Sequence, residues 1–329
     1  MCLKDGAKPV QSNLARHWSL AVFASRETCE VLHNSVLATM ASADAAGVLV
    51  TIDVLINGNS SLATAMTKRL VGTSLLNRQS VVRIWDLPLG DKAHAWNEYF
   101  SRIWSGESLA FFTDGYVKPH QDAIRLLGHA VMSDTVALGG SGAPSIGRTA
   151  RNQRTRMLAE GGMQGNFCCI KGDTIAELKK RNIKLPVGLY RTDSLVSTML
   201  AFGLDPLGKS WNQKRILVCP DVSWINDYKN WWNAGHVTDQ LKRVLRQARG
   251  MLETAAIKNH FSARRRAPEL LPGTASELVV EWKERCTDEF RDLIRRHPLC
   301  FYAMKHFDSP PANSAAYIAP RLVWTSNPA

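Results

Sequence analysis

The sequence predicts an α/β protein with a mixed, mostly parallel β-sheet, helices on both faces of that sheet, and a helical C-terminal extension. Three observations indicate this fold. Short apolar segments alternate with segments of helical spacing through the first two-thirds of the chain. The expected strands are apolar throughout, which is typical of strands covered on both sides. Beyond about residue 225 the pattern becomes helical and basic.

The expected elements follow one another in strand–helix order. We expect strands over 18–24, 47–57, 81–87, 108–113, 134–140, 165–172 and 215–221. We expect helices over 29–42, 62–71, 92–104, 120–131, 173–182, 194–203, 237–257 and 275–296. The Gly/Ser/Arg-rich segment 139–156 is expected to be a mobile loop, with GGSG as a flexible connector rather than a phosphate loop.

The same pattern divides the chain into four parts. The expected parts are an N-terminal extension over 1–17, a main domain over 18–225, a helical basic extension over 226–306, and a loosely ordered tail over 307–329. Within the extension, three consecutive arginines at 264–266 are expected to mark a linker.

The charge distribution favours an anionic partner. The net charge is +12. Residues 1–239 carry 26 basic and 20 acidic side chains, whereas the shorter stretch 240–329 carries 15 and 9. This denser basic region suits a nucleotide phosphate, a phospholipid surface or nucleic acid. A solvated basic face is the simpler explanation of any single charge run.

Composition argues against several classes of protein. No segment approaches the length of about 18 uncharged apolar residues that a membrane span requires. The N-terminus lacks the apolar core of a secretory signal. The seven scattered cysteines favour reduced thiols over a disulfide framework. We therefore expect a cytoplasmic protein, with peripheral contact to the inner face of the membrane through its basic C-terminal part.

Two stretches carry the strongest functional signal. GDKAHAWN (90–97) begins an expected helix, and FFTDGYVKP (111–119) ends the next expected strand. Together they resemble the family 2, GT-A-type glycosyltransferases, in which Gly-[Asn/Asp]-Lys-Ala-x-Ala-x-Asn precedes an Asp-x-Asp-x-x-Pro strand end. The resemblance covers residues 18–250. It implies a GT-A-like, Rossmann-related fold that binds a nucleotide-sugar donor.

The resemblance implies a donor-binding role for Glu27, Asn57, Lys92, Asn97, Asp114 and Tyr116. Asp114 would also hold a divalent cation, Mg²⁺ or Mn²⁺. Tyr116 stands where the family repeats the aspartate, and a phenol oxygen is a poor ligand for these ions unless deprotonated. Asp114 would therefore have to hold the cation alone or share it with a further ligand. Lys92 could equally be a surface lysine, and Asn97 a buried amide that braces its helix.

A third stretch supplies the expected acceptor side. GLYRTDSLVSTML (188–200) resembles the family's Glu-Asp-x-x-Leu segment, with Thr192 in place of the usual Glu. Asp193 would then be the general base, although it could equally serve as a helix N-cap. GGMQGNFCCIKGD (161–173) resembles the acceptor-side strand. The expected acceptor-side residues are Gly162, Gln164 and Trp232, whose indole can stack on a sugar.

The expected function is inverting transfer of a sugar from a nucleotide-diphosphate donor to a hydroxyl of a saccharide, lipid or small molecule. Two alternatives stay open. Tyr116, Thr192 and the INGN turn (56–59) favour a non-catalytic binding protein that keeps the fold. The basic C-terminal part favours a binder of anionic membranes or nucleic acid, although no recognised nucleic-acid motif is present. A nucleotidyltransferase on the same fold would need a Gly-rich first loop that this sequence lacks.

Overall fold

The computed structural model describes residues 17–72, 80–145, 150–226, 235–305, 307 and 318–326, with only the backbone described over 235–243. A sheet in the order β10-β3-β2-β1-β4-β7-β6-β8 forms its centre. Its strands are β1 (His17–Ala24), β2 (Leu49–Asn57), β3 (Val81–Leu87), β4 (Leu109–Asp114), β6 (Gly139–Gly142), β7 (Phe167–Lys171), β8 (Ile216–Cys219) and β10 (Arg321–Thr325). A second sheet pairs β5 (Val117–Pro119) with β9 (Trp224–Asn226).

The main sheet is mostly parallel. β2 pairs in parallel with β3 and with β1, β1 with β4, and β6 with β8. The antiparallel strands are β10, beside β3, and β7, between β4 and β6.

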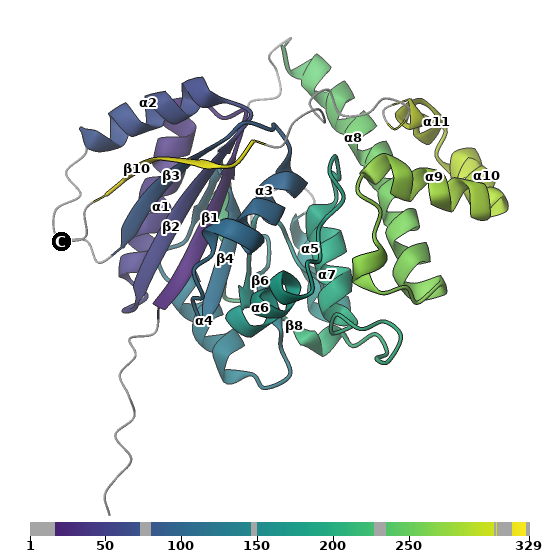
Figure 1. The fold of residues 1–329 in the computed structure, drawn as a ribbon, viewed down its shortest axis with the longest axis horizontal. Helices are drawn as coiled ribbons and strands as arrows, with labels where there is room; N and C mark the ends of the chain where they lie inside the picture. The colour runs from purple at the N-terminus through teal and green to yellow at the C-terminus, as the bar shows by residue number, and fades with distance from the viewer. Residues whose placement is uncertain are drawn as a thin grey trace, which may run out of the picture.

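Helices cover both faces of the sheet (Figure 1). One face packs against α1 (Cys29–Asp44), α2 (Ser60–Val71) and α4 (Ala123–Ser133). The other packs against α3 (Lys92–Glu98), the π-helical turn η1 (Tyr99–Ile103), α6 (Gly172–Lys180) and α7 (Thr192–Ala201), and α5 (Ala150–Glu160) precedes β7. The apolar core on this second face continues into the C-terminal helices.

The C-terminal region is helical. It contains α8 (Gly235–Lys258), the π-helical turn η3 (Asn259–Ala263), α9 (Ala275–Arg285), α10 (Thr287–Arg296) and α11 (Leu299–Met304). Short 3₁₀ turns lie at η2 (Gln213–Arg215) and η4 (Pro268–Leu270). The α/β fold class, with helices on both faces and a helical C-terminal region, is thus confirmed. No helix in the described part of the chain combines the length and apolar character needed to cross a membrane.

The tail expected over 307–329 is wrong for residues 321–325. Although last in the chain, β10 lies beside β3 at the edge of the sheet (Figure 1). The amide of Ser326 donates to the carbonyl of Val82, and the amide of Val82 donates to the Ser326 hydroxyl, both at 2.8 Å. The sequence RLVWT is β-branched and aromatic, so it has strand propensity despite its Pro/Ala/Ser-rich surroundings.

The loop expected over 139–156 is also wrong at both ends, because GGSG forms β6 and residues 150–160 form α5. The glycines of β6 reflect crowding rather than flexibility. A Cβ on Gly140 would lie 2.5 Å from a methyl group of Val131 in α4 and 2.9 Å from the Leu217 carbonyl oxygen. Only glycine lets β6 approach α4 and β8 this closely.

The single helix expected over 275–296 is two helices separated at Cys286. The turn brings the rings of Trp282 and Phe290 to a centroid separation of 5.9 Å. Eight residues apart on a straight helix, they would be about 12 Å apart along its axis. The expected linker arginines are also held in place, because Arg264 and Arg266 both pair with Glu281 of α9.

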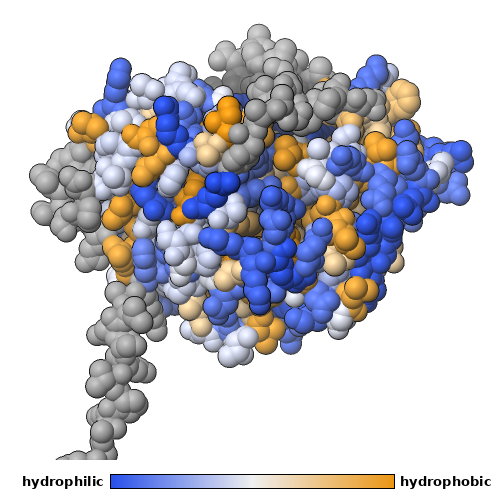
Figure 2. Space-filling view, in the orientation of Figure 1, coloured by the Kyte–Doolittle hydropathy of each residue, from blue (hydrophilic) through white to orange (hydrophobic). Residues whose placement is uncertain are grey.

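Many of the arginines in the C-terminal helices form ion pairs with acidic residues of the same helices. Arg291 pairs with Asp288 (3.2 Å) and Arg295 with Asp292 (3.3 Å) on α10, which buries none of its residues. Hydrophilic residues accordingly predominate on this side of the molecule, at the right of Figure 2. The basic extension is therefore partly self-neutralised rather than a continuous cationic face.

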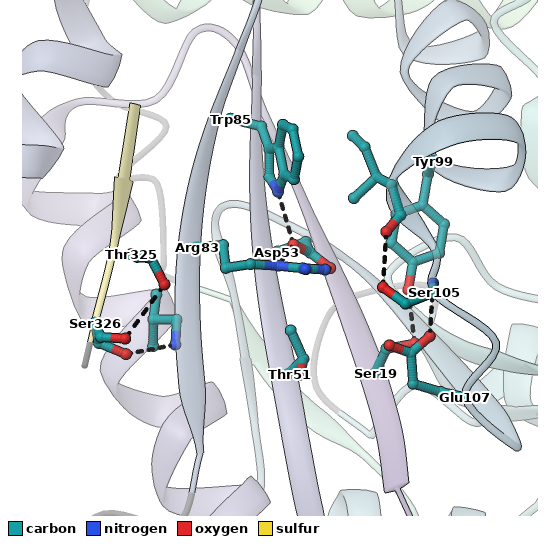
Figure 3. A network of polar contacts seen from close by, with 12 residues as sticks. Ser19, Thr51, Asp53, Arg83, Trp85, Tyr99, Ser105, Glu107, Thr325 and Ser326 are labelled. Atoms are coloured by element: carbon teal, nitrogen blue, oxygen red, sulfur yellow. Dashed lines mark hydrogen bonds and ion pairs between the residues drawn. The ribbon is translucent and has the colours of Figure 1, made fainter. Parts of the chain in front are cut away.

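A buried polar network crosses the sheet below the strand ends (Figure 3). Asp53, in the centre of β2, is fully buried and accepts hydrogen bonds from Arg83 (2.6 and 2.9 Å) and from the indole of Trp85 (2.7 Å). Burial raises the pKa of Asp53, and Arg83 opposes that shift. Two-point pairing with Arg83 offsets the cost of burying this carboxylate within an otherwise apolar strand.

We predict that acid weakens the fold through His260 in η3. Burial lowers the pKa of this histidine to about 4, whereas an unfolded histidine titrates near about 6.5. Neutral His260 therefore contributes to the free energy of unfolding above a pH of about 6.5. This contribution, up to about 3 kcal/mol, is lost as the pH falls toward 4. Urea unfolding at several pH values should show a smaller acid loss for His260→Gln. An identical pH dependence in both proteins would contradict this.

Candidate functional site

The carboxyl ends of the parallel strands meet at one edge of the sheet. In the register of β1, Ala24 lies opposite Ile56 of β2, and Phe23 lies opposite Asp114 of β4. Asn57, the last residue of β2, lies opposite Leu87 at the end of β3. Pairing in parallel therefore brings residues from four strands, β1 to β4, to the same level, where ligands bind in sheets of this kind.

Two turns at this edge touch through glycine. The amide of Gly58 donates to the carbonyl of Leu87 (2.7 Å), and its φ is +68°. A Cβ on Gly58 would lie 2.4 Å from the Cα of Gly90. This approach places the end of β2 against the start of α3, and so brings Asn57 and Lys92 into one region.

Asp91 fixes α3 relative to α7. One of its carboxylate oxygens accepts the amide of His94 (2.7 Å) and caps α3, while the other accepts the amide of Gly188 (2.9 Å). Burial raises the pKa of Asp91, and the two backbone amides oppose that shift. Sequence reasoning matched Asp91 to a motif but missed this connection, because Gly188 lies almost a hundred residues further along the chain.

Lys92, Asp114 and Tyr116 form the centre of the site. The Lys92 ammonium pairs with Oδ1 of Asp114, and the Tyr116 hydroxyl donates to Oδ2 (3.1 Å). Burial disfavours the charged lysine, but Asp114 outweighs burial and raises the pKa of Lys92. Burial and the Asp114 charge both raise the pKa of Tyr116, so its phenol stays protonated. Lys92 is therefore an ion-pair partner rather than a solvated surface lysine.

An aromatic floor supports this centre. Lys92 lies over the ring of Phe23 at 5.5 Å, and Phe23 stacks against Trp96 of α3. Trp96 in turn stacks on Phe112 of β4 with a centroid separation of 4.1 Å. Because these rings are buried, they hold α3 on the sheet and set the position of the lysine above them.

Asp193 is a second carboxylate whose charge acts on Lys92. It is in the first turn of α7, where its Oδ2 accepts the amide of Gly165 (3.2 Å) and its Oδ1 accepts the amide of Ser194 (2.9 Å). Its charge contributes to the raised pKa of Lys92. The turn that holds Asp193 is attached to β4, since the Thr113 hydroxyl donates to the carbonyl of Asn166 (2.8 Å).

A buried glutamate from α8 anchors the segment before α7. Glu253 is fully buried and accepts the amides of Tyr190 (3.0 Å) and Arg191 (2.8 Å). It also pairs with Arg249 (2.9 Å), which donates to the carbonyl of Gly188. Burial raises the pKa of Glu253, against the effect of Arg249 and the amides. The sequence signal was only a glutamate four residues after an arginine on a helix.

The other residues expected to bind the sugar donor differ in whether their side chains already make hydrogen bonds. Glu27, just after β1, accepts the amides of Ser25 (2.7 Å) and Arg26 (2.9 Å). Asn57 is 4% exposed, and its buried Oδ1 has no hydrogen-bond partner among the described residues. Asn97 exchanges two hydrogen bonds with the backbone of Leu185 (2.9 and 2.8 Å) and so has the bracing role.

The expected acceptor residues lie in the turn before β7 or outside the described residues. Gly162 has a φ of +121°, and a Cβ added there would have nothing within 4 Å. The backbone amide of Gln164 donates to the Ser141 hydroxyl (3.0 Å). This turn continues into Gly165 and therefore borders Asp193. Trp232 lies outside the described residues.

The donor atoms at Asp114 do not fit a divalent cation. Mg²⁺ and Mn²⁺ favour ionised oxygen ligands. Lys92 and Tyr116 use both oxygens of Asp114, and the protonated Tyr116 is a donor rather than a ligand. Within the described ranges, no three His, Cys, Asp or Glu side chains are arranged to hold a metal ion. The metal expected at Asp114 thus finds no support in the residues around it.

Comparison with known proteins supports the fold. No family model and no curated protein matches the chain. Among solved structures, the chain is similar to the mannosyltransferase PcManGT from Pyrobaculum calidifontis, solved in complex with GDP-Man and Mn²⁺. The TM-score is 0.50 at 14% identity, over 89% of this chain and 84% of that chain. At this identity, the likeness concerns the fold alone.

We predict that Gly58→Ala destabilises the protein by about 2–4 kcal/mol, because it adds a clash with Gly90 to the strain of a positive φ. Gly47→Ala is the matched control, since Gly47 has a φ of +66° but nothing within 4 Å of its Cβ position. Its cost should be the strain alone, about 1 kcal/mol. Urea unfolding measures both, and equal losses would contradict the close contact.

We also predict that Glu253→Ala lowers the free energy of unfolding by about 3–5 kcal/mol, because it leaves Arg249 and two amides without their acceptor. Glu253→Gln keeps one acceptor oxygen and should lose less. Glu284→Ala, at an exposed position on α9, should change stability by less than about 0.5 kcal/mol. A loss at Glu253 no larger than that at Glu284 would show that the anchor does not stabilise the fold.

Proposed function

We propose that this protein is a glycosyltransferase of the GT-A type, similar to family 2, that moves a sugar from a nucleotide-diphosphate donor to an acceptor hydroxyl. The observation that carries the proposal is the grouping of Lys92 and Asp114 at the strand ends, with the charge of Asp193 acting on the same lysine. The stretches 90–97, 111–119 and 188–200 thereby each contribute a charged side chain to this region. The fold shared with a solved mannosyltransferase supports the same reaction class.

The donor would bind across the ends of β2, β1 and β4. Asn57 is suited to contact the nucleoside, because its buried Oδ1 lacks a partner and an unsatisfied acceptor costs about 1–3 kcal/mol. Lys92 would bind the diphosphate, and Asp114 the sugar hydroxyls. Glu27 borders the same region, since its charge contributes to the raised pKa of Tyr116.

Asp193 would serve as general base. Its two amide partners hold the carboxylate in place, and a carboxylate has further lone pairs with which to accept a proton. The acceptor oxygen would attack the anomeric carbon from the side opposite the diphosphate, which inverts the configuration. A saccharide, lipid or small molecule would enter past Gly162 and Gln164, which border Asp193.

A second candidate is a binding protein that keeps the donor site without turnover. The observation favouring it is that Lys92 and Tyr116 already use both oxygens of Asp114. Both candidates bind a nucleotide sugar, and only the first releases the nucleoside diphosphate.

We predict that Asp193→Asn lowers sugar transfer by about 10²–10⁴-fold while donor binding changes little, since the amide keeps an oxygen for Gly165 but cannot take a proton. Donor binding is measured by thermal shift with UDP-, GDP- and dTDP-sugars, and turnover by nucleotide release. Asp173→Asn, an exposed first-turn residue of α6, is the matched control. Wild-type turnover in Asp193→Asn would remove the base assignment. Donor binding without turnover in the unchanged protein would favour the binding protein.

A further inference from the structure

We propose that Lys92 supplies the positive charge that a divalent cation supplies in related sites, so that donor binding here needs no metal ion. This inference rests on the proposed function, because it concerns how the same nucleotide-sugar donor is held. It assigns Tyr116 a role as well, namely to occupy the second oxygen of Asp114 with a hydroxyl donor.

Both carboxylate oxygens of Asp114 accept hydrogen bonds from neighbouring side chains. Its side chain is 16% exposed, and its two oxygens accept from Lys92 and from Tyr116. Both oxygens of Asp114 thus already accept a hydrogen bond, and a divalent cation bound beside them would be repelled by the Lys92 ammonium. Lys92 therefore disfavours a metal ion at this position.

Lys92 also keeps capacity for a ligand. Its side chain is 31% exposed, and its ammonium makes one hydrogen bond to the described residues, to Asp114. An ammonium has three donors, so two can reach phosphate oxygens. The ammonium lies 5.5 Å from the centroid of the Phe23 ring, and the charges of Asp114 and Asp193 both favour its protonated form.

Backbone amides compensate the negative charge of the other two carboxylates at the site. Glu27 accepts two backbone amides, and Asp193 accepts two at the start of the ten-residue helix α7. Amides and a helix N-terminus offset negative charge. Arg191 makes no ion pair within the described part of the chain, and its guanidinium lies 5.7 Å from the Tyr190 ring centroid.

The reaction balances with these groups alone. The bond from the anomeric carbon to the phosphate oxygen breaks, and its electron pair goes to that oxygen, which Lys92 receives with its free N–H groups. The acceptor oxygen forms the new bond to the anomeric carbon. The acceptor proton passes to Asp193. Charge stabilisation by fixed N–H donors serves the leaving group without a further co-reactant.

The first experiment measures Mn²⁺ binding directly. The full chain is treated with EDTA, desalted and titrated with Mn²⁺, and free Mn²⁺ is followed by electron paramagnetic resonance. We expect no saturable site in the unchanged protein below millimolar Mn²⁺. Lys92→Met with Tyr116→Asp, which frees Asp114 and adds a carboxylate, should bind Mn²⁺ at least about tenfold more tightly. A micromolar site in the unchanged protein that Asp114→Asn removes would overturn the proposal.

The second experiment measures binding of GDP and UDP by calorimetry in EDTA and in Mn²⁺. We expect affinity within about twofold in the two buffers, and a loss of about tenfold or more in Lys92→Met, as for a lost charged hydrogen bond. Lys180→Met, at an exposed position of α6, is the matched control and should bind normally. Thermal unfolding checks that each variant folds.

The outcomes separate this inference from the function on which it rests. Nucleotide binding that disappears in EDTA and returns with Mn²⁺ would overturn the role of Lys92 and leave the glycosyltransferase proposal intact. Absence of nucleotide binding in both buffers would overturn both. Binding in EDTA that Lys92→Met leaves unchanged would show that another group holds the diphosphate.

Discussion

The parallel pairing of β2, β1 and β4 is the constraint on which the rest of this structure depends. Strands that run in the same direction end at the same edge, so Asn57, Ala24 and Asp114 come together although they are distant in sequence. The helices that follow β1 and β3 begin at this edge, which points the N-terminus of α1 and the first turn of α3 toward it. The Gly58–Gly90 contact then fixes the spacing between neighbouring turns.

The C-terminal helices complete the site rather than merely extending the chain. Glu253 and Arg249 of α8 hold the backbone that leads into α7, and α7 carries Asp193. Asp91 holds the same segment from the other side, at Gly188. The helix that carries Asp193 is therefore positioned by Glu253 of α8 on one side and by Asp91, the N-cap of α3, on the other. Such buried carboxylates are tolerated because every one of them accepts several hydrogen bonds.

Two ion pairs on this molecule differ in how deeply they are buried. Asp53 and Arg83 pair at two points beneath the strand ends, and the carboxylate has no exposure. Asp53 lies within the sheet, and Arg83 compensates its buried charge. Lys92 and Asp114 pair at the edge, where the lysine keeps exposure and unused donors. The same pairing thus braces the sheet at Asp53 and leaves exposed N–H donors at Lys92.

The sequence by itself determined the alternation of strands and helices, the boundaries of β3, and the placement of Lys92 and Asp114 at neighbouring element ends, because hydrophobic period and motif order are local properties. Tertiary structure decided the rest. The partners of Asn97, Asp91 and Val82 lie 88, 97 and 244 residues away, and no local pattern encodes such pairings. GGSG and RLVWT looked like loop and tail because their strand character depends on neighbours in the sheet. The pairing of Asp114 with Lys92 likewise depends on the packing of α3 beside β4.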